Sequence, residues 1–217
     1  MLARVLSLGI GYLFGLFQTG YFYSKKKDFD LRSHGSGNSG TTNTIRTMGW
    51  KAGGIVFAGD LFKCILAVLL VGFLYRPVWG ADVKLLELYA AFGAILGHDF
   101  PFYLKFQGGK GMACTAGLII AAASPLIPWE LVLFLILVLA TRYVSLGSII
   151  ASIGLPVFAF ITHKMGLYYA GGTYFTELMV LMCVIGALNI SRHHANIGRL
   201  VHGTENKFGS HKEKEQK

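Results

Sequence analysis

The sequence predicts an all-α fold, a polytopic membrane bundle of seven transmembrane helices. Hydrophobic residues make up 53% of the 217 residues and charged residues only 14%, whereas soluble domains average about 25% charged residues. Glycine occurs 28 times, and small residues let membrane helices pack closely. Apolar segments recur along the chain, and a spanning helix needs about 20 such residues. The composition excludes a disordered chain, and three cysteines exclude a disulfide scaffold.

The expected spans follow one another along most of the chain. The first lacks a clear small-residue cleavage site, so we expect a retained helix and not a signal peptide. The third, fourth and fifth are short, which is acceptable where a helix lines a polar cavity or enters the membrane only partway. Pro125 and Pro128 separate the fourth from the fifth, because proline interrupts helical hydrogen bonding. The spans cover residues 2–22, 52–75, 85–98, 112–127, 129–141, 146–162 and 174–192.

Basic residues predict the orientation of the bundle. Of the 20 Lys and Arg residues, 15 follow odd-numbered spans, four lie on the opposite side, and Lys63 lies within a span. Since cytoplasmic connections are enriched in Lys and Arg, we expect the N-terminus outside and the C-terminus in the cytoplasm. Residues 1–202 are expected to form one integral-membrane domain, and residues 203–217 a polar cytoplasmic tail.

The net charge of +9 narrows the expected partners. A basic cytoplasmic rim favours contact with the lipid bilayer or with an anionic substrate. No nucleic-acid partner is expected, because the charge is spread around apolar spans and no binding module is visible.

Four polar segments, rich in Gly, Ser, Asn, His and Arg, each follow an odd-numbered span. Loops that only connect helices have no reason to concentrate such residues on one side of a membrane. We therefore expect a functional site on the cytoplasmic side. The segments cover residues 30–46, 97–115, 142–145 and 192–205.

The second segment contains Gly108, Gly109, Lys110 and Gly111, a pattern suited to holding a phosphate. Glycine lets the backbone approach an anion and direct N–H groups at it, and a helix starting near Gly111 would add its positive end. The loop is not a Walker A motif, because Leu104 replaces the first Gly and a Gly follows the Lys. The alternative is a flexible hinge with a Lys that reaches the interface.

The first segment offers compact hydrogen-bonding groups at Ser36, Asn38 and Asn43, and a phosphate-binding fork at Arg46. Taken alone, the same residues are more typical of turns and a helix cap.

In the last segment, His193 and Asn196 share a helix face, flanked by Arg192 and Arg199. His193 could orient a hydroxyl, transfer a proton or donate to a phosphate. An ordinary histidine at the membrane boundary is the alternative.

Other reactive side chains have structural interpretations. Asp60 and Lys63 lie at i and i+3 within a span, so a mutual ion pair is expected. No metal site is expected, because the histidines at 193, 194 and 202 lack matching carboxylate or cysteine spacing. Without a CxxC pair, the cysteines at 64, 114 and 183 are expected to pack as small apolar residues.

Taken together, four blocks resemble those of the bacterial acyl-phosphate:glycerol-3-phosphate acyltransferases. They read GSGNSGTTNTIR, GHDFPFYLKFQGGKGMACT, RYVSLGSI and RHHANIGRLVHGTE, in the same order and with similar spacing of spans. The resemblance implies a seven-span enzyme of the bacterial inner membrane with a cytoplasmic active site. It would transfer an acyl group from acyl phosphate to glycerol 3-phosphate. The products would be 1-acylglycerol 3-phosphate (lysophosphatidic acid) and phosphate, in the first acylation of phospholipid synthesis.

The resemblance, together with the chemistry of the residues described above, indicates roles for individual residues. The expected catalytic residues are Ser36, Lys110, His193 and Asn196. The expected substrate-binding residues are Asn38, Arg46, Gly108, Gly109, Gly111 and Ser145, with Asp60, Lys63 and Glu205 structural or orienting. Three positions depart from the family pattern: Gln107, where Lys or Arg is frequent, and Ser39 and Thr41, which replace an aliphatic residue and Ala.

Acyl phosphate is already activated, so neither a covalent step nor a cofactor is expected. The substrate's own phosphate is the expected proton acceptor, since no Asp or Glu is placed by motif. The chain lacks the H-x-x-x-x-D spacing of the other large acyltransferase class, which favours acyl phosphate over acyl-CoA or acyl carrier protein. The acyl chain is expected between spans, and the protein is expected to be a monomer. The alternative function is a small transporter or channel for a phosphorylated metabolite, but no inverted repeat is evident.

Overall fold

The computed structural model describes residues 1–169 and 172–209, in which helices are joined by turns and loops, as the all-α prediction requires. Residues 210–217 of the predicted tail lie outside the described residues. The α-helices are α1 (Leu2–Gly15), α2 (Thr19–Lys25), α3 (Thr41–Met48), α4 (Trp50–Trp79), α5 (Val83–Asp99), α6 (Met112–Ala122), α7 (Ile127–Thr141), α8 (Val144–Lys164), α9 (Phe175–Arg192) and α10 (His194–Val201). Short 3-10 turns are η1 (Leu31–Ser33), η2 (Gly80–Asp82), η3 (Phe102–Leu104) and η4 (Ser124–Leu126).

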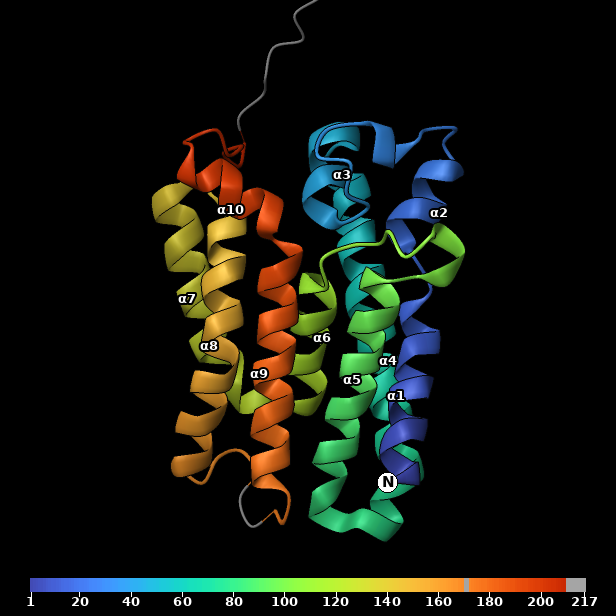
Figure 1. The fold of residues 1–217 in the computed structure, drawn as a ribbon, viewed down its shortest axis with the longest axis vertical. Coiled ribbons are helices and arrows are strands. Elements are labelled where there is room, and N and C mark those ends of the chain that lie inside the picture. The colour runs from blue at the N-terminus through green and yellow to red at the C-terminus, as the bar shows by residue number, and fades with distance from the viewer. Residues whose placement is uncertain (170–171, 210–217) are drawn as a thin grey trace, which may run out of the picture.

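Within the described residues, five helical segments are long and apolar enough to cross a membrane: Leu2–Lys25, Trp50–Leu104, Ser124–Thr141, Val144–Lys164 and Phe175–Arg192. The second contains both α4 and α5, which run in opposite directions side by side (Figure 1). Helix α6 has only 11 residues. Large apolar side chains cover the outside of the bundle, as contact with lipid requires.

The predicted span 2–22 is divided into α1 and α2. Gln18 lies at the break with an extended backbone, and its side chain is buried. Its Nε2 donates to the carbonyl oxygens of Gly97 and His98, at 3.3 and 3.0 Å. Helix α5 therefore decides where the first helix breaks.

The predicted span 112–127 ends early, because α6 stops at Ala122, shortly before Pro125. Helix α7 then begins at Ile127, two residues earlier than predicted. Pro128 fits in the first turn of α7, because N–H groups there have no partner within the helix and proline lacks an N–H.

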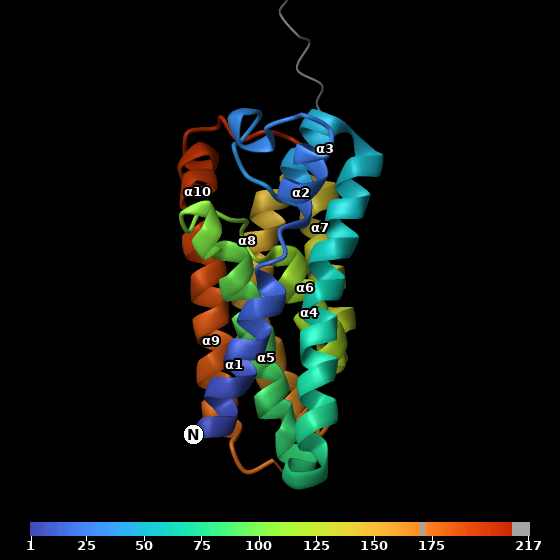
Figure 2. The same cartoon turned by 90° about the vertical axis from the view of Figure 1, so that its right-hand side faces the viewer.

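The helices form two groups. One contains α1, α4, α5 and α6 with α2 and α3 beside them, and the other contains α7, α8 and α9 (Figures 1 and 2). Within the first group α1 and α5 touch through their backbones: a Cβ added to Gly11 would lie 1.9 Å from the Ala90 carbonyl oxygen. Only glycine leaves room for such a contact. Small residues allow close packing of membrane helices in general. Contacts of α5 with α9, and of η4 with α6 and α8, join the two groups.

The four polar segments gather toward one end of the bundle, opposite the N-terminus (Figures 1 and 2). Helices α2, α3 and α10, the loop between α5 and α6, and the α7–α8 turn all lie there. The prediction that these segments share one side of the bundle agrees with this arrangement.

Candidate active site

A cavity of about 1040 Å³ lies between the two helix groups. Its polar end is lined by side chains from all four polar segments, which are far apart in the sequence. Its remaining length is lined mainly by apolar side chains of α4, α6 and α7. The polar lining includes Ser36, Asn38, Arg46, Lys110, Ser145, His193, Asn196, Arg199 and Glu205.

Glycine allows the loop 108–111 to pack against the end of α5. The N–H of Gly109 donates to the His98 carbonyl at 3.0 Å, and a Cβ on Gly109 would lie 1.9 Å from His98 Nε2. Gly111 has a φ of +71° and precedes the first residue of α6. From the other side, Arg192 Nη2 donates to the Gly109 carbonyl at 2.9 Å. The loop thus leads into the positive end of a helix, where an anion is stabilised.

Lys110 begins a line of hydrogen bonds along the cavity wall. Its Nζ donates to Asn196 Oδ1, and Asn196 Nδ2 donates to Glu205 Oε1 at 3.0 Å. The other Glu205 oxygen accepts from Arg199 Nε at 2.7 Å. Burial, followed by the charge of Arg199, lowers the pKa of Lys110 to about 8. A poorly solvated ammonium of this kind is well suited to binding an anion.

His193 is buried and held in one tautomer. Its Nδ1 lies 2.8 Å from the Asn189 carbonyl oxygen. A carbonyl can only accept, so Nδ1 carries the hydrogen and Nε2 of the neutral ring is an acceptor. Burial lowers the pKa of His193 to about 4, and Lys110 adds to this effect. At neutral pH His193 therefore offers a lone pair.

Asn43 shapes the first segment from its place on α3. Its Oδ1 accepts the backbone N–H of Ser36 at 2.8 Å, and its Nδ2 donates to the His34 carbonyl at 3.0 Å. The turn between them needs Gly35, whose φ is +63°. Arg46 follows Asn43 by three residues on the same helix and also reaches the cavity. Turn formation and cavity lining are thus combined in one segment.

A buried ionic network lies beside the glycine loop. Lys63 Nζ is 2.9 Å from Asp60 Oδ1 and 2.8 Å from His98 Nδ1. It also donates to the Phe17 carbonyl at 2.7 Å, so all three ammonium hydrogens are used. Thr19 Oγ1 donates to Asp60 Oδ1 at 3.1 Å. The expected pair of Asp60 and Lys63 is thus part of a larger network that ties α4 to α5 and to the break after α1.

The charges at the polar end favour an anion over a metal. Arg46, Lys110, Arg142 and Arg199 bring positive charge, whereas Glu205 and the Asp60 that pairs with Lys63 bring carboxylates. Over residues 1–169 and 172–209, no three His, Cys, Asp or Glu side chains are grouped closely enough to hold a metal ion. The site is therefore suited to ligands that carry phosphate or carboxylate groups.

Known proteins match the chain over almost its whole length. Residues 5–203 match the family model described as glycerol-3-phosphate acyltransferase. The chain belongs to the glycerol-3-phosphate acyltransferase family. A member from Clostridioides difficile (strain 630) is 37% identical over 206 residues, which cover 94% of this chain and 95% of that protein. Glycerol-3-phosphate acyltransferase 2 from Moorella thermoacetica is 40% identical, over 94% of this chain and 97% of that protein.

Solved structures of an acyltransferase agree with this membership. PlsY (YgiH), an integral membrane glycerol 3-phosphate acyltransferase in its glycerol 3-phosphate form, has a TM-score of 0.81 with this chain and 33% sequence identity. The similarity covers 95% of this chain and 96% of PlsY. Its lysophosphatidic acid form has a TM-score of 0.79, 32% identity and 95% coverage of each chain. The present chain is thus a multi-pass membrane protein of this family.

In this family member, the residues predicted from sequence fall into two sets. Those with side chains on the cavity are Ser36, Asn38, Arg46, Asp60, Lys110, Ser145, His193, Asn196 and Glu205. Gly108, Gly109, Gly111 and Lys63 instead support the wall from behind, through the loop and ionic contacts above. Of the three departures from the family pattern, Thr41 lines the cavity, Ser39 is buried nearby, and Gln107 is exposed.

The acyltransferase fold brings to the site several residues that the sequence did not predict as site residues. His98 lines the cavity and supports the loop, although its only visible signal was its place in the GHD block. Arg192 was noted as a flanking cation, yet its contact with Gly109 joins segments 83 residues apart. Glu130 also lines the cavity, and nothing in the expected motifs pointed to it.

Proposed function

We propose that this protein transfers a fatty acyl group from acyl phosphate to glycerol 3-phosphate. The products are 1-acylglycerol 3-phosphate and inorganic phosphate. The observation that carries the proposal is the cavity itself, which joins a cationic polar end to a long apolar groove. One ligand with a phosphate head and an acyl tail fits both parts. A second, small phosphate ester fits beside it among the remaining cations.

In this proposal the acyl phosphate head binds Lys110 and the loop 108–111, next to the start of α6. Glycerol 3-phosphate is positioned by Arg46, His193 and Asn196. Ser36 and Ser145 complete the hydrogen bonding around the reacting carbonyl, and the Ser145 hydroxyl is buried without a partner among the described residues. The enzyme contributes to catalysis mainly in two ways. It holds both substrates at attacking distance, and it stabilises the negative charge that develops during the reaction. Asp60, Lys63 and Glu205 orient these groups.

The reaction balances without a covalent enzyme intermediate. The glycerol hydroxyl oxygen forms a bond to the acyl carbon, the bond from that carbon to the phosphate oxygen breaks, and phosphate leaves. The hydroxyl proton goes to a substrate phosphate, whose second pKa is about 6 in a phosphate monoester. His193, with its pKa lowered to about 4, is a weaker base than that phosphate. Its Nε2 lone pair is therefore assigned to orienting the hydroxyl.

The same proposal includes the membrane arrangement. Helices α1, α4, α5, α6, α7, α8 and α9 form the seven passes of one domain, residues 1–202, with α6 crossing only part of the bilayer. In this arrangement the N-terminus is outside and the C-terminus is in the cytoplasm. The enrichment of Lys and Arg at the end that holds the cavity supports this orientation, because cytoplasmic connections are rich in these residues. The site then faces the cytoplasm of a bacterial inner membrane, and each monomer carries a complete site.

The proposal is tested with purified protein in lipid, mixed with palmitoyl phosphate and glycerol 3-phosphate. Phosphate release and lysophosphatidic acid are measured together, with palmitoyl-CoA as the alternative donor. We expect equal amounts of both products from palmitoyl phosphate and none from palmitoyl-CoA. Lys110→Ala should abolish turnover, whereas Lys51→Ala, at an exposed position outside the cavity lining, should retain it. Folded protein that makes no lysophosphatidic acid would contradict the proposal.

A further inference from the structure

The chain that follows α10 forms part of the cavity wall. Glu205, Asn206 and Phe208 line the cavity, whereas Lys207 and Gly209 are exposed and do not line it. None of these five residues belongs to a helix. The segment 205–208 is therefore a single layer of chain, with one face on the cavity and the other on the outside of the bundle.

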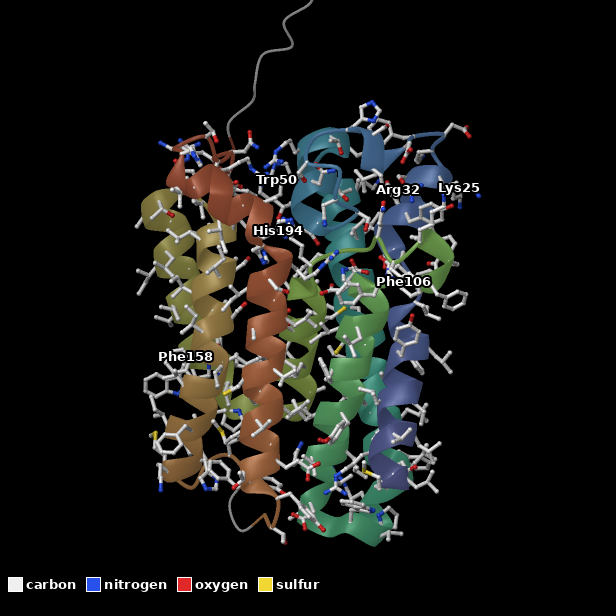
Figure 3. The ribbon with its side chains drawn as sticks, in the orientation of Figure 1. Lys25, Arg32, Trp50, Phe106, Phe158 and His194 are labelled. Atoms are coloured by element: carbon white, nitrogen blue, oxygen red, sulfur yellow. The ribbon has the colours of Figure 1, made fainter. Side chains whose placement is uncertain are left out.

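Phe208 joins the two helix groups at the polar end of the bundle. Its backbone N–H donates to the Arg142 carbonyl at 2.7 Å, and Arg142 Nη2 donates to the Phe208 carbonyl at 3.0 Å. Its ring meets the Trp50 ring edge-on, with centroids 5.2 Å apart. Arg142 follows α7 in one group, and Trp50 is the first residue of α4 in the other. Figure 2 shows the chain passing across the polar end from α10 toward α4, and Figure 3 shows Trp50 at that end.

Another side of the polar end is open. Ser36 and Arg46 line the cavity and are exposed, so a small ligand can enter beside α3. Ser145 and His193 line the same cavity but are only 8% and 3% exposed. The polar end thus has an entrance beside α3 and a wall, the segment 205–208, between Trp50 and Arg142.

The proposed donor makes such a wall useful, because an acyl phosphate is activated toward any nucleophile. When water attacks, its oxygen forms a bond to the acyl carbon and the bond from that carbon to the phosphate oxygen breaks. The water proton passes to the phosphate, and the products are a fatty acid and inorganic phosphate. Active sites suppress such side reactions by excluding water.

We infer that the segment 205–208, held in place through Phe208, keeps water from the acyl carbon, so that the glycerol hydroxyl attacks it instead. The inference rests on the proposed acyltransferase function and assigns it a means of avoiding hydrolysis of the donor. The Phe208 ring is the apolar part of this wall, and Trp50 and Arg142 position it. Bound glycerol 3-phosphate fills the open side beside α3.

A purely structural role for Phe208 is the alternative that the test must separate. In that role Phe208 only connects the two helix groups, and its loss loosens the bundle. The melting temperature then falls, and hydrolysis and transfer decline together, so that their ratio stays unchanged.

The experiment supplies palmitoyl phosphate and saturating glycerol 3-phosphate to the protein in lipid. It measures the ratio of palmitate to lysophosphatidic acid, after subtraction of the spontaneous hydrolysis seen in lipid alone. Both products come from one preparation, so the ratio does not depend on the fraction of folded protein. We expect Phe208→Ala to raise the ratio about tenfold, which corresponds to ~1.4 kcal/mol between the two barriers.

Two further variants control for side-chain size and for loss of an aromatic ring elsewhere. Phe208→Leu keeps a large apolar side chain and should stay near the wild-type ratio. Phe73→Ala, at an exposed position of α4 outside the cavity lining, should keep that ratio. The double variant Lys110→Ala with Phe208→Ala should form neither product, as expected when hydrolysis occurs at the transfer site.

Trp50 provides a second test, because it is exposed and lies outside the cavity lining. Trp50→Ala should raise the ratio, and adding Phe208→Ala should bring it no higher than Phe208→Ala alone, because Trp50 acts through Phe208. An unchanged ratio in Phe208→Ala, or in Trp50→Ala where Phe208→Ala does not fold, would overturn the inference and leave the acyltransferase function in place. Wild-type protein that makes no lysophosphatidic acid would instead overturn the proposed function, and the inference with it.

Discussion

The Nδ1–H of His193 donates to the backbone carbonyl of Asn189 at 2.8 Å, four residues earlier in the chain. The last turn of α9 thereby holds the imidazole as a fixed neutral acceptor. A ring in this state can receive a hydroxyl hydrogen without taking the proton. The tautomer depends on a backbone carbonyl, so a change of the Asn189 side chain alone would not alter it.

We expect His193→Ala to lower kcat by about a hundredfold or more, a typical value for loss of one preorganised hydrogen-bonding group. His193→Gln places an amide oxygen near the position of Nε2 and should recover part of that loss. Initial rates with saturating glycerol 3-phosphate measure both effects. Equal activity of the Ala and Gln variants would contradict an acceptor role. His194→Ala, at an exposed neighbouring position, serves as the control.

Lys110 should give the reaction an alkaline limit. Its pKa of about 8 means that the free site loses a positive charge as pH rises through that value. Because kcat/KM reports the free enzyme, kcat/KM for acyl phosphate should fall above pH 8 or so. Arginine stays charged in this range, so the fall should disappear in Lys110→Arg even if overall activity is lower. An identical alkaline limb in both proteins would assign it to another group.

Gly109 should tolerate no side chain. A Cβ there would lie 1.9 Å from His98 Nε2, and relieving such an overlap costs about 1–3 kcal/mol. We expect Gly109→Ala to raise the KM for acyl phosphate and to lower the melting temperature. Gly54→Ala is the matched control, since a Cβ at Gly54 meets nothing within 4 Å. Normal kinetics in Gly109→Ala would show that the loop can shift without loss.

Glu205 connects Asn196 to Arg199 through its two oxygens, at 3.0 and 2.7 Å. Glu205→Ala breaks both hydrogen bonds and should raise the KM for glycerol 3-phosphate about tenfold, in line with hydrogen bonds to charged groups. Glu205→Gln keeps one acceptor oxygen and should show a smaller effect. Isothermal titration with glycerol 3-phosphate separates binding from turnover. A fall in kcat with unchanged affinity would contradict this positioning role.

The pair of Asp60 and Lys63 should matter for stability. Lys63→Met leaves a buried carboxylate without its cation, a change that typically costs about 3–5 kcal/mol. The double variant Asp60→Leu with Lys63→Met removes both charges and should be more stable than Lys63→Met alone. Thermal unfolding in detergent compares the three proteins. A double variant no more stable than the single one would show that the contacts of Lys63 with His98 and the Phe17 carbonyl, and that of Asp60 with Thr19, matter more than the charge balance.

Much of this protein was determined by local sequence. Apolar segments of sufficient length placed the membrane helices, and the distribution of Gly, Ser, His and Arg marked the segments that meet around the cavity. Such features are visible because hydrophobicity and backbone freedom act over short distances along the chain. The start of α6 after Gly111 and its end before Pro125 follow from the same local chemistry.

Tertiary structure alone decided which distant segments meet and how their contacts affect the site residues. Gln18 breaks the first span because carbonyls of α5 are its partners, and Arg192 holds Gly109 from 83 residues away. The tautomer of His193 and the lowered pKa of Lys110 depend on burial and on neighbours brought by other helices. Glu130 lines the cavity only because the η4 turn contacts both α6 and α8 and so brings the start of α7 beside them. Contacts between distant segments have no local signature, since each side chain meets its partner only after the helices have packed.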